Sequence, residues 1–276
     1  MRKKSRLLIQ SFNNAVRAWG NLGIVLPLLV YGGVQFLVLA GLIVSSIPGM
    51  PFSAFIAFFY GESFLHYPQN YLVLPAAFNA VNTVLSGFAG TIVVGLVTRR
   101  FYSKHVNPGS ESGIKHILPC YHHLFIVWLL QIGTLVFLNV IYLWLIEDRT
   151  PDPVFAIPAR FGVNIFISAV FAFSTIFIVI EKKKWWSALQ LSFKRFLKFA
   201  PSTIVIVGIP VVLQYPFEFV FTHSDRIIER LNPEMIAVLV SLGIVFSIFL
   251  NSLTIGTLTG MYIGPVKKKE TSGTEK

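Results

Sequence analysis

Three asparagines inside long apolar segments are the residues of this chain whose type and spacing are best suited to chemistry. Each is the second residue of one of three related heptapeptides, VNTVLSG, VNIFISA and LNSLTIG. The next basic residue follows Asn82 by 17 positions (Arg99), Asn164 by 18 (Lys182) and Asn251 by 16 (Lys267). At about 1.5 Å per helical residue, each amide is expected roughly 25 Å from that basic boundary. A carboxamide at this depth in a membrane hydrogen-bonds either a neighbouring helix or a polar ligand.

Other small polar residues form a polar seam with these asparagines. Asn79 and Ser86 share a helical face with Asn82, Ser168 shares one with Asn164, and Thr254 lies close to Asn251. Two interpretations stay open. The seam is either a packing surface between helices, in which each contact contributes about 0.6 kcal/mol, or a substrate or lipid-headgroup site at a pseudo-threefold centre. The Ser252–Gly256–Gly260 spacing is typical of close helix packing.

One histidine cluster has the residue types of a metal site. His116, Cys120 and His123 would share the face of a helix, and two imidazoles with a thiolate can bind zinc. However, Pro119 interrupts such a helix and no carboxylate is near in the sequence. We therefore expect no metal and no other cofactor.

Catalytic signatures are missing from the sequence. It contains no G-x-x-x-x-G-K-[ST], G-x-G-x-x-G, G-x-S-x-G or H-E-x-x-H motif. The paired carboxylates are Glu147 and Asp148, in a loop whose proline and acidic residues indicate solvation. Glu218, beside Pro216, is the acid that could relay protons within a span, and we interpret it as interfacial. We predict that the protein is not an enzyme.

The composition places these residues in a membrane protein. Of 276 residues, 54% are hydrophobic and 13% are charged, whereas soluble domains carry about 25% charged residues. Six apolar segments are long enough to cross about 30 Å of hydrocarbon as helices: 22–46, 72–98, 124–146, 159–180, 202–221 and 235–264. Pro210 is expected to kink the fifth. The predicted fold class is all-α, a polytopic membrane protein.

Basic residues follow these spans with a strong asymmetry. Of the 23 Lys and Arg residues, five precede the first span, four lie between the second and third, six between the fourth and fifth, and four after the sixth. This pattern predicts that both termini are cytoplasmic. It also accounts for the net charge of +11 without a nucleic-acid partner. The single cysteine, Cys120, excludes an intramolecular disulfide.

An amphipathic segment precedes each pair of spans on the basic side. This pattern predicts three repeats, 5–104, 110–184 and 185–266. Together they form one membrane domain, which is followed by a basic tail, 267–276. The apolar stripes are Leu8, Phe12, Ala15, Val16 and Trp19, then Ile114, Ile117, Leu118 and Tyr121, then Trp186, Leu189, Phe193, Phe196, Leu197 and Ala200. The aromatic loop 51–61 is expected to lie at the membrane interface or to re-enter the membrane.

The third amphipathic segment, EKKKWWSALQLSFKRFLKF, has the features of a helix lying on a membrane. Its basic residues are Lys182, Lys183, Lys184, Lys194, Arg195 and Lys198. The interfacial aromatic residues are Trp185 and Trp186, with Trp19 in the first segment. Each basic residue near an anionic surface contributes about 1 kcal/mol. The expected partner is therefore membrane lipid, in particular anionic lipid.

The stretch IFIVIEKKKWWSALQLSFKRFLKF resembles a segment of the six-span membrane domain that is fused to some glycerophosphodiester phosphodiesterases, and of its stand-alone relatives. The matching positions are Glu181, Ala188, Leu189, Ser192, Lys194 and Arg195. The ending TGMYIGPVKKKE also resembles the closing span of that family, with its tyrosine and basic tail. This chain contains no soluble phosphodiesterase domain, so the resemblance implies a fold and not that activity.

Two functions of different classes stay open. The first is a non-enzymatic, multi-pass plasma-membrane protein whose basic cytoplasmic face binds anionic lipid and which scaffolds or modulates envelope lipid or protein assemblies. The second is a permease whose cytoplasmic amphipathic helices couple it to a separate ATPase, so a protein partner on that face is expected in this case. A nucleic-acid or peptide binder is disfavoured because the basic residues follow the topology rule.

Overall fold

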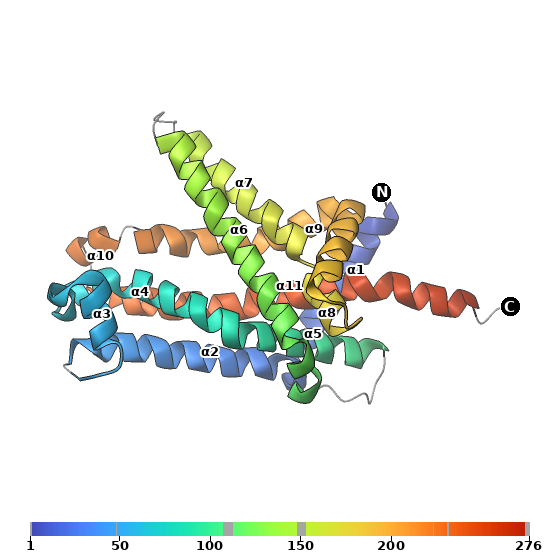
Figure 1. Ribbon diagram of the computed structural model, residues 1–276, viewed down its shortest axis with the longest axis horizontal. Helices are drawn as coiled ribbons and strands as arrows, with labels where there is room; N and C mark the ends of the chain where they lie inside the picture. Colours follow the sequence, from blue (N-terminus) through green and yellow to red (C-terminus); the bar gives the residue numbers. More distant parts are fainter. Residues whose placement is uncertain are drawn as a thin grey trace. The chain divides into compact units, whose positions relative to one another are not determined.

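The computed structural model describes the backbone of residues 2–47, 49–106, 113–147, 153–222, 224–230 and 232–273, and the side chains of 6–47, 49–106, 113–141, 161–217, 224–226, 228–230 and 232–264. Within these ranges the chain is helical and has no strands, which confirms the all-α class (Figure 1). The α-helices are α1 (Arg2–Trp19), α2 (Leu22–Ile43), α3 (Ser53–Tyr60), α4 (Gln69–Leu85), α5 (Thr91–Val106), α6 (Tyr121–Glu147), α7 (Pro153–Phe171), α8 (Ser174–Val179), α9 (Trp185–Thr222), α10 (Ser224–Arg230) and α11 (Met235–Gly273).

Six helical segments are long and apolar enough to cross a membrane, as the sequence predicts. They are Leu22–Ser46, Gln69–Val106, Ile114–Ile141, Phe161–Val179, Trp185–Phe217 and Met235–Gly264. The first and the last coincide with the predicted bounds. The protein is therefore a multi-pass membrane protein, whose helices satisfy their own backbone hydrogen bonds in hydrocarbon.

The second span is not a uniform α-helix. Between α4 and α5, residues Ser86–Gly90 form a π-helical turn, within the sequence SGFAG. A π turn inserts one extra residue into an α-helix and is frequent near functional sites. This turn lies one helical turn beyond Asn82.

The long helix α9 is broken at Phe199, where φ is −123° and ψ is 22°. Pro201 follows two residues later. In a regular helix its ring would clash with the carbonyl of Leu197, and it has no N–H to donate. The break separates the predicted amphipathic segment from the fifth span. Pro210 lies in a helical stretch without non-helical backbone angles, so the kink expected there stays a prediction.

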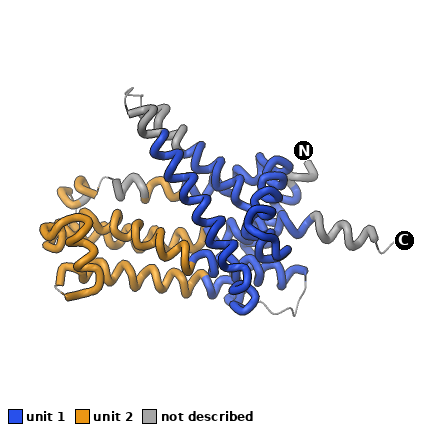
Figure 2. Tube along the Cα trace, in the orientation of Figure 1, with its two compact units in different colours: residues 1–27, 90–212, 251–276 blue, residues 28–89, 213–250 orange. Residues whose placement is uncertain are grey.

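The chain divides into two compact units, each assembled from segments that are distant in sequence (Figure 2). Unit 1 contains residues 1–27, 90–212 and 251–276, and unit 2 contains residues 28–89 and 213–250. The boundaries of these units do not follow the predicted repeats. Unit 1 thus contains most of α9 and the second half of α11, whereas unit 2 contains most of α2, all of α4 and the first half of α11.

Candidate functional site

Helix α1 packs antiparallel against the second half of α11 in unit 1. Leu7, Ser11 and Ala15 of α1 lie against Gly264, Gly260 and Gly256 of α11, in that order. A Cβ atom on Gly256 would lie 2.8 Å from the Cβ of Ala15, and one on Gly260 would lie 3.0 Å from the Cβ of Ser11. Helix backbones approach this closely only where the side chains between them are small. The predicted small-residue spacing of the last span therefore holds α1 in place.

The face of α1 that packs against α11 coincides only in part with the predicted apolar stripe, which it shares at Ala15. Ser11 and Ala15 are buried, whereas Phe12 and Val16 are exposed by 45% and 47%. These two apolar side chains are thus left to contact lipid.

A cavity of about 480 Å³ lies beside this contact and has a basic, polar character. It is lined by Arg6, Leu7, Gln10, Ser11, Asn14, Phe101, His105, Gly260, Ile263 and Gly264, from α1, α5 and α11. We call it the Arg6–His105 pocket. A guanidinium and two carboxamides supply hydrogen-bond donors, an imidazole adds a polar ring, and the remaining wall is mostly apolar.

The orientation of His105 is fixed by Phe101, one turn earlier in α5. The two rings stack with centroids 4.3 Å apart and planes inclined by 24°. Nδ1 of His105 lies 2.8 Å from the carbonyl oxygen of Phe101, to which it must donate. Its Nε2 atom is therefore the one that can interact with a bound group.

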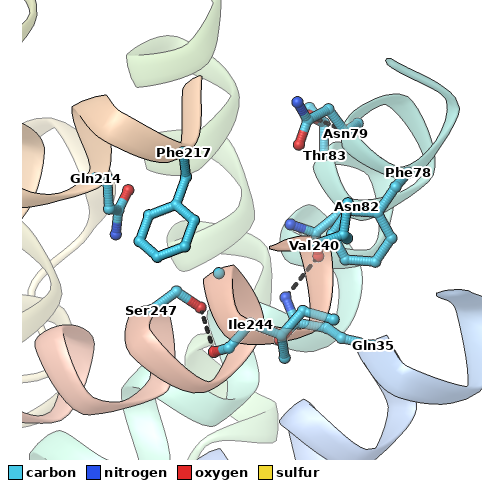
Figure 3. A pocket seen from close by; sticks show the side chains of 11 residues that line it. Gln35, Phe78, Asn79, Asn82, Thr83, Gln214, Phe217, Val240, Ile244 and Ser247 are labelled. Atoms are coloured by element: carbon cyan, nitrogen blue, oxygen red, sulfur yellow. Dashed lines mark hydrogen bonds between the residues drawn. The ribbon is translucent and has the colours of Figure 1, made fainter. Parts of the chain in front are cut away.

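A second polar cavity, of about 270 Å³, lies in unit 2 and contains two of the predicted seam residues. Its walls are formed by Gln35, Phe78, Asn79, Asn82, Thr83, Gln214, Phe217, Val240, Gly243, Ile244 and Ser247 (Figure 3). We call it the amide cavity. Asn82 is held there by two donors, since Nε2 of Gln35 lies 2.7 Å and the hydroxyl of Tyr31 lies 3.4 Å from its Oδ1.

The other predicted asparagines have separate surroundings. In unit 1, Nδ2 of Asn139 in α6 donates to Oδ1 of Asn164 in α7 at 3.3 Å. Asn251 is exposed on α11. Asn82 and Asn164 thus each pair with an amide in the preceding span of the same hairpin, which is the arrangement expected of helix-packing contacts.

Sequence reasoning missed the two partner amides, Gln35 and Asn139. A signal for them exists in the sequence: they stand 13 and 15 positions after Leu22 and Leu124, the starts of the predicted first and third spans. Gln214 stands 12 positions after Ser202, the start of the predicted fifth span. Each odd-numbered span thus has an amide at a similar depth, and this amide could have been interpreted as the partner of the asparagine in the following span.

The remaining seam residues interact locally. The hydroxyl of Ser86 donates to the carbonyl of Thr83 at 2.8 Å. Ser168 and Thr254 are half-buried in unit 1. Glu147, Asp148 and Glu218, considered above for acid–base chemistry, have side chains outside the described residues.

The residues that carry the family resemblance meet in unit 1. The hydroxyl of Tyr262 in α11 donates to Oε1 of Glu181 at 2.8 Å. The guanidinium of Arg195 donates to the carbonyl oxygens of Met261 at 3.0 Å and Tyr262 at 3.4 Å. Its central carbon lies 4.9 Å from the centre of the Phe199 ring. Arg195 is half-buried, and its Nη2 atom donates to protein carbonyls, whereas its buried Nε has no hydrogen-bond partner among the described atoms.

Ser192 joins α9 to the interruption between α7 and α8. Its hydroxyl donates to the carbonyl of Val170 at 2.6 Å and accepts a hydrogen bond from the backbone N–H of Phe173 at 3.2 Å. Ser192 is fully buried. The serine thus satisfies backbone groups that a helix break leaves without intrahelical partners.

A tight turn after α8 positions Glu181. The backbone N–H of Lys183 donates to the carbonyl of Phe177 at 3.2 Å, and Lys182 has a φ of 52°. The donor stands six residues after its acceptor, one more than in the six-to-one bond of a Schellman motif, and it follows a left-handed residue of the kind that ends many helices, usually glycine. The turn brings the chain directly from α8 into α9.

The predicted interfacial residues other than Arg195 are on the surface. Lys182, Lys183, Lys184, Lys194 and Lys198 are exposed. Trp186 is exposed by 58%, Trp185 and Trp19 are half-buried, and the two adjacent rings of Trp185 and Trp186 meet edge to face with centroids 5.6 Å apart. Of the six residues in the predicted stripe, Trp186, Phe193 and Leu197 are exposed, Leu189 and Ala200 are half-buried and Phe196 is buried.

The histidines near α6 do not share a helical face as the metal interpretation required. Two 3₁₀ turns, Ile114–His116 and Leu118–Cys120, precede α6, and Pro119 lies in the second. Cys120 is buried. Among the side chains that the structure describes, no group of three His, Cys, Asp or Glu residues is arranged to hold a metal ion.

One tyrosine outside the spans has an altered acidity. In unit 2, the hydroxyl of Tyr67 lies 3.3 Å from Oε1 of Glu234 and donates to it. Loss of hydration, and then the charge of Glu234, raise the pKa of Tyr67 above its ordinary value. Tyr67 stays protonated at neutral pH and links the loop before α4 to the start of α11.

No model of a protein family, no curated protein and no solved structure matches the chain.

Proposed function

We propose that this protein is a non-enzymatic membrane protein that binds anionic lipid at its basic face, with the Arg6–His105 pocket as the headgroup site. The observation that carries the proposal is the composition of this pocket. Donors from Arg6, Gln10 and Asn14 surround a space with apolar walls. A phosphate needs several strong donors, and the glycerol and acyl parts of a lipid need apolar contact.

The distribution of charge supports the same proposal. Nineteen of 23 basic residues lie in the segments that we assign to the cytoplasmic side. The five exposed lysines beside α9 add a diffuse attraction to an anionic surface, at about 1 kcal/mol for each charge near that surface. Such a protein, in the plasma membrane, would scaffold or modulate lipid or protein assemblies.

A permease coupled to a separate ATPase is the second candidate. One observation favours it, the presence of a polar cavity among the spans of unit 2. It predicts stable co-purification with a nucleotide-hydrolysing subunit. Lipid binding without such a subunit favours the first candidate.

The test is retention of lipid by the full chain in nanodiscs of phosphatidylcholine with and without phosphatidylglycerol, read by native mass spectrometry. We expect Arg6→Gln to lower phosphatidylglycerol retention about fivefold, since one charge near the headgroup is lost. Lys104→Gln is the matched control, because Lys104 is exposed, adjacent to His105 and absent from the pocket wall. Equal retention by Arg6→Gln and Lys104→Gln would contradict the pocket assignment.

A further inference from the structure

The amide cavity of unit 2 has a chemical character different from that of the Arg6–His105 pocket. Its walls come from α2, α4, the end of α9 and the first half of α11 (Figure 3). The 11 residues that line it include no acid, lysine, arginine or histidine. A charged ligand in such a place would lose its hydration without gaining a counter-charge. The walls therefore select an uncharged group.

One buried acceptor in the cavity wall has no partner. Gln35 is 5% exposed, and its Nε2 atom donates to Asn82. Its Oε1 atom is buried and receives no hydrogen bond from the described protein atoms. An unsatisfied buried acceptor costs about 1–3 kcal/mol, and a ligand that donates to it removes this cost.

The hydroxyls of the wall are also arranged to accept. Thr83 donates to the carbonyl of Asn79 at 2.8 Å, and Ser247 donates to the carbonyl of Ile244 at 2.9 Å. Since each hydroxyl has a single proton, both oxygens can then only accept from a ligand. Together with Oε1 of Gln35 they offer three acceptors to a group that carries several O–H donors.

Donors and apolar surface complete the site. Asn82 uses its Oδ1 for Gln35 and Tyr31, which leaves its Nδ2 group to donate. Gln214 brings a further amide, and the rings of Phe78 and Phe217 supply flat apolar faces. Alternating acceptors and donors beside aromatic faces suit a sugar ring, whose hydroxyls both donate and accept and whose C–H faces pack on aromatic rings.

We propose that the amide cavity binds an uncharged, hydroxyl-rich sugar group. Its volume of about 270 Å³ is near the lower limit of roughly 300 Å³ for ligand pockets, so it suits one ring and not an entire lipid. Asn79 and Thr83 are exposed at its wall, so a ligand can reach it from the protein surface. The sugar is either free in solution or the headgroup of a glycolipid. This proposal does not depend on anionic-lipid binding.

The test uses the full chain in phosphatidylcholine nanodiscs with two probes, monoglucosyl diacylglycerol in the bilayer and methyl glucoside in solution. Native mass spectrometry counts the retained glycolipid. We expect wild-type protein to retain it above the level set by its share of the bilayer. Gln35→Leu should lower this excess about tenfold, because the buried acceptor is lost.

Two further variants separate binding from folding. Thr83→Val keeps the shape of an exposed residue and removes one acceptor, so it should lower retention without unfolding the protein. Asn139→Leu is the matched control, since it breaks the corresponding amide pair between α6 and α7 and should leave retention unchanged. Competition by methyl glucoside would identify a free sugar as a ligand, and retention without competition would identify the glycolipid headgroup. Retention of neither probe, or equal retention by Thr83→Val, Gln35→Leu and wild type, overturns the proposal.

Discussion

The hydroxyl of Tyr262 donates to the carboxylate of Glu181 across 2.8 Å, and this bond ties the last span to the turn that follows α8. Tyr262 is 8% exposed and its ring also meets Phe177 edge to face, with centroids 5.8 Å apart. Four segments of unit 1 thus meet at one place, because Arg195 of α9 donates to the carbonyl of the same tyrosine and its guanidinium carbon lies 5.8 Å from the centre of the tyrosine ring. Several predictions about stability rest on these contacts.

Tyr262→Phe should lower the free energy of unfolding by about 1 kcal/mol, because it removes one hydrogen bond to a carboxylate and keeps the ring contact. Thermal unfolding of the purified protein in detergent measures the change. Tyr121→Phe, which removes the same atom from a half-buried ring at the start of α6, should have a smaller effect. Equal effects of the two changes would contradict the assignment.

Arg195→Lys should destabilise the protein although the charge is kept. The Nη2 atom of Arg195 reaches both carbonyls while the planar guanidinium lies over the Phe199 ring, and a lysine ammonium does not stack on a ring as a guanidinium does. We expect a loss of about 1–3 kcal/mol, the range for a hydrogen-bonded charged group. Lys194→Gln, at the exposed neighbouring position, should be close to neutral in the same denaturation assay.

Two Gly→Ala changes should act in opposite directions. At Gly256 the new Cβ would lie 2.8 Å from the Cβ of Ala15, so α1 must move away, at a cost of about 1–3 kcal/mol. At Gly133 in α6 nothing lies within 4 Å of the new atom, and alanine should stabilise the helix by about 0.5–1 kcal/mol. Gly256→Ala should also weaken phosphatidylglycerol retention, since α1 forms a wall of the Arg6–His105 pocket. Melting temperatures that change together for both variants would refute this packing.

Lys182→Gly should stabilise the protein. A left-handed conformation costs a side-chain-bearing residue roughly 1–2 kcal/mol, and glycine adopts it freely. Part of this gain is lost to the greater freedom of glycine in the unfolded chain, so we expect about 0.5–1 kcal/mol. Lys183→Gly removes the same charge next to it and should not stabilise. A lower melting temperature for Lys182→Gly than for Lys183→Gly would show that the turn differs from the one described.

The number of spans could be predicted from the sequence because the hydrocarbon thickness sets a minimum length for an apolar helix. Which face of each helix packs against the rest of the protein was harder to predict. In α1 and α9 the predicted apolar stripes contain Phe12 and Phe193, which are exposed, whereas Ser11 and Ser192, which lie outside those stripes, are buried. Lipid tails are as apolar as leucine, so a membrane helix gains little by burying an apolar face in protein. Small and hydrogen-bonding residues decide the contact instead.

The candidate sites were predictable only in part for a related reason. Asn82 was found because its heptapeptide is repeated, whereas Gln35 stands alone in an apolar segment and its partner is 47 residues away. Arg6 and His105 are likewise distant in sequence, and they line the same pocket beside Gly260 and Gly264 of α11. Contacts between separate helices depend on which faces meet, and single-sequence periodicity does not determine this.

The π-helical turn at Ser86–Gly90 has a consequence for how this chain tolerates changes in length. The boundary between the two compact units falls inside that turn, between residues 89 and 90. Phe78 and Asn82, before the turn, belong to unit 2, whereas Val97 and Phe101, after it, are buried in unit 1. A π-helical turn contains one residue more than an α-helical turn, and one residue corresponds to about 100° of rotation about a helix axis. Deleting one residue here would keep the composition and hydropathy of the span almost unchanged, yet it would shift the register of the side chains along the helix by about 100°.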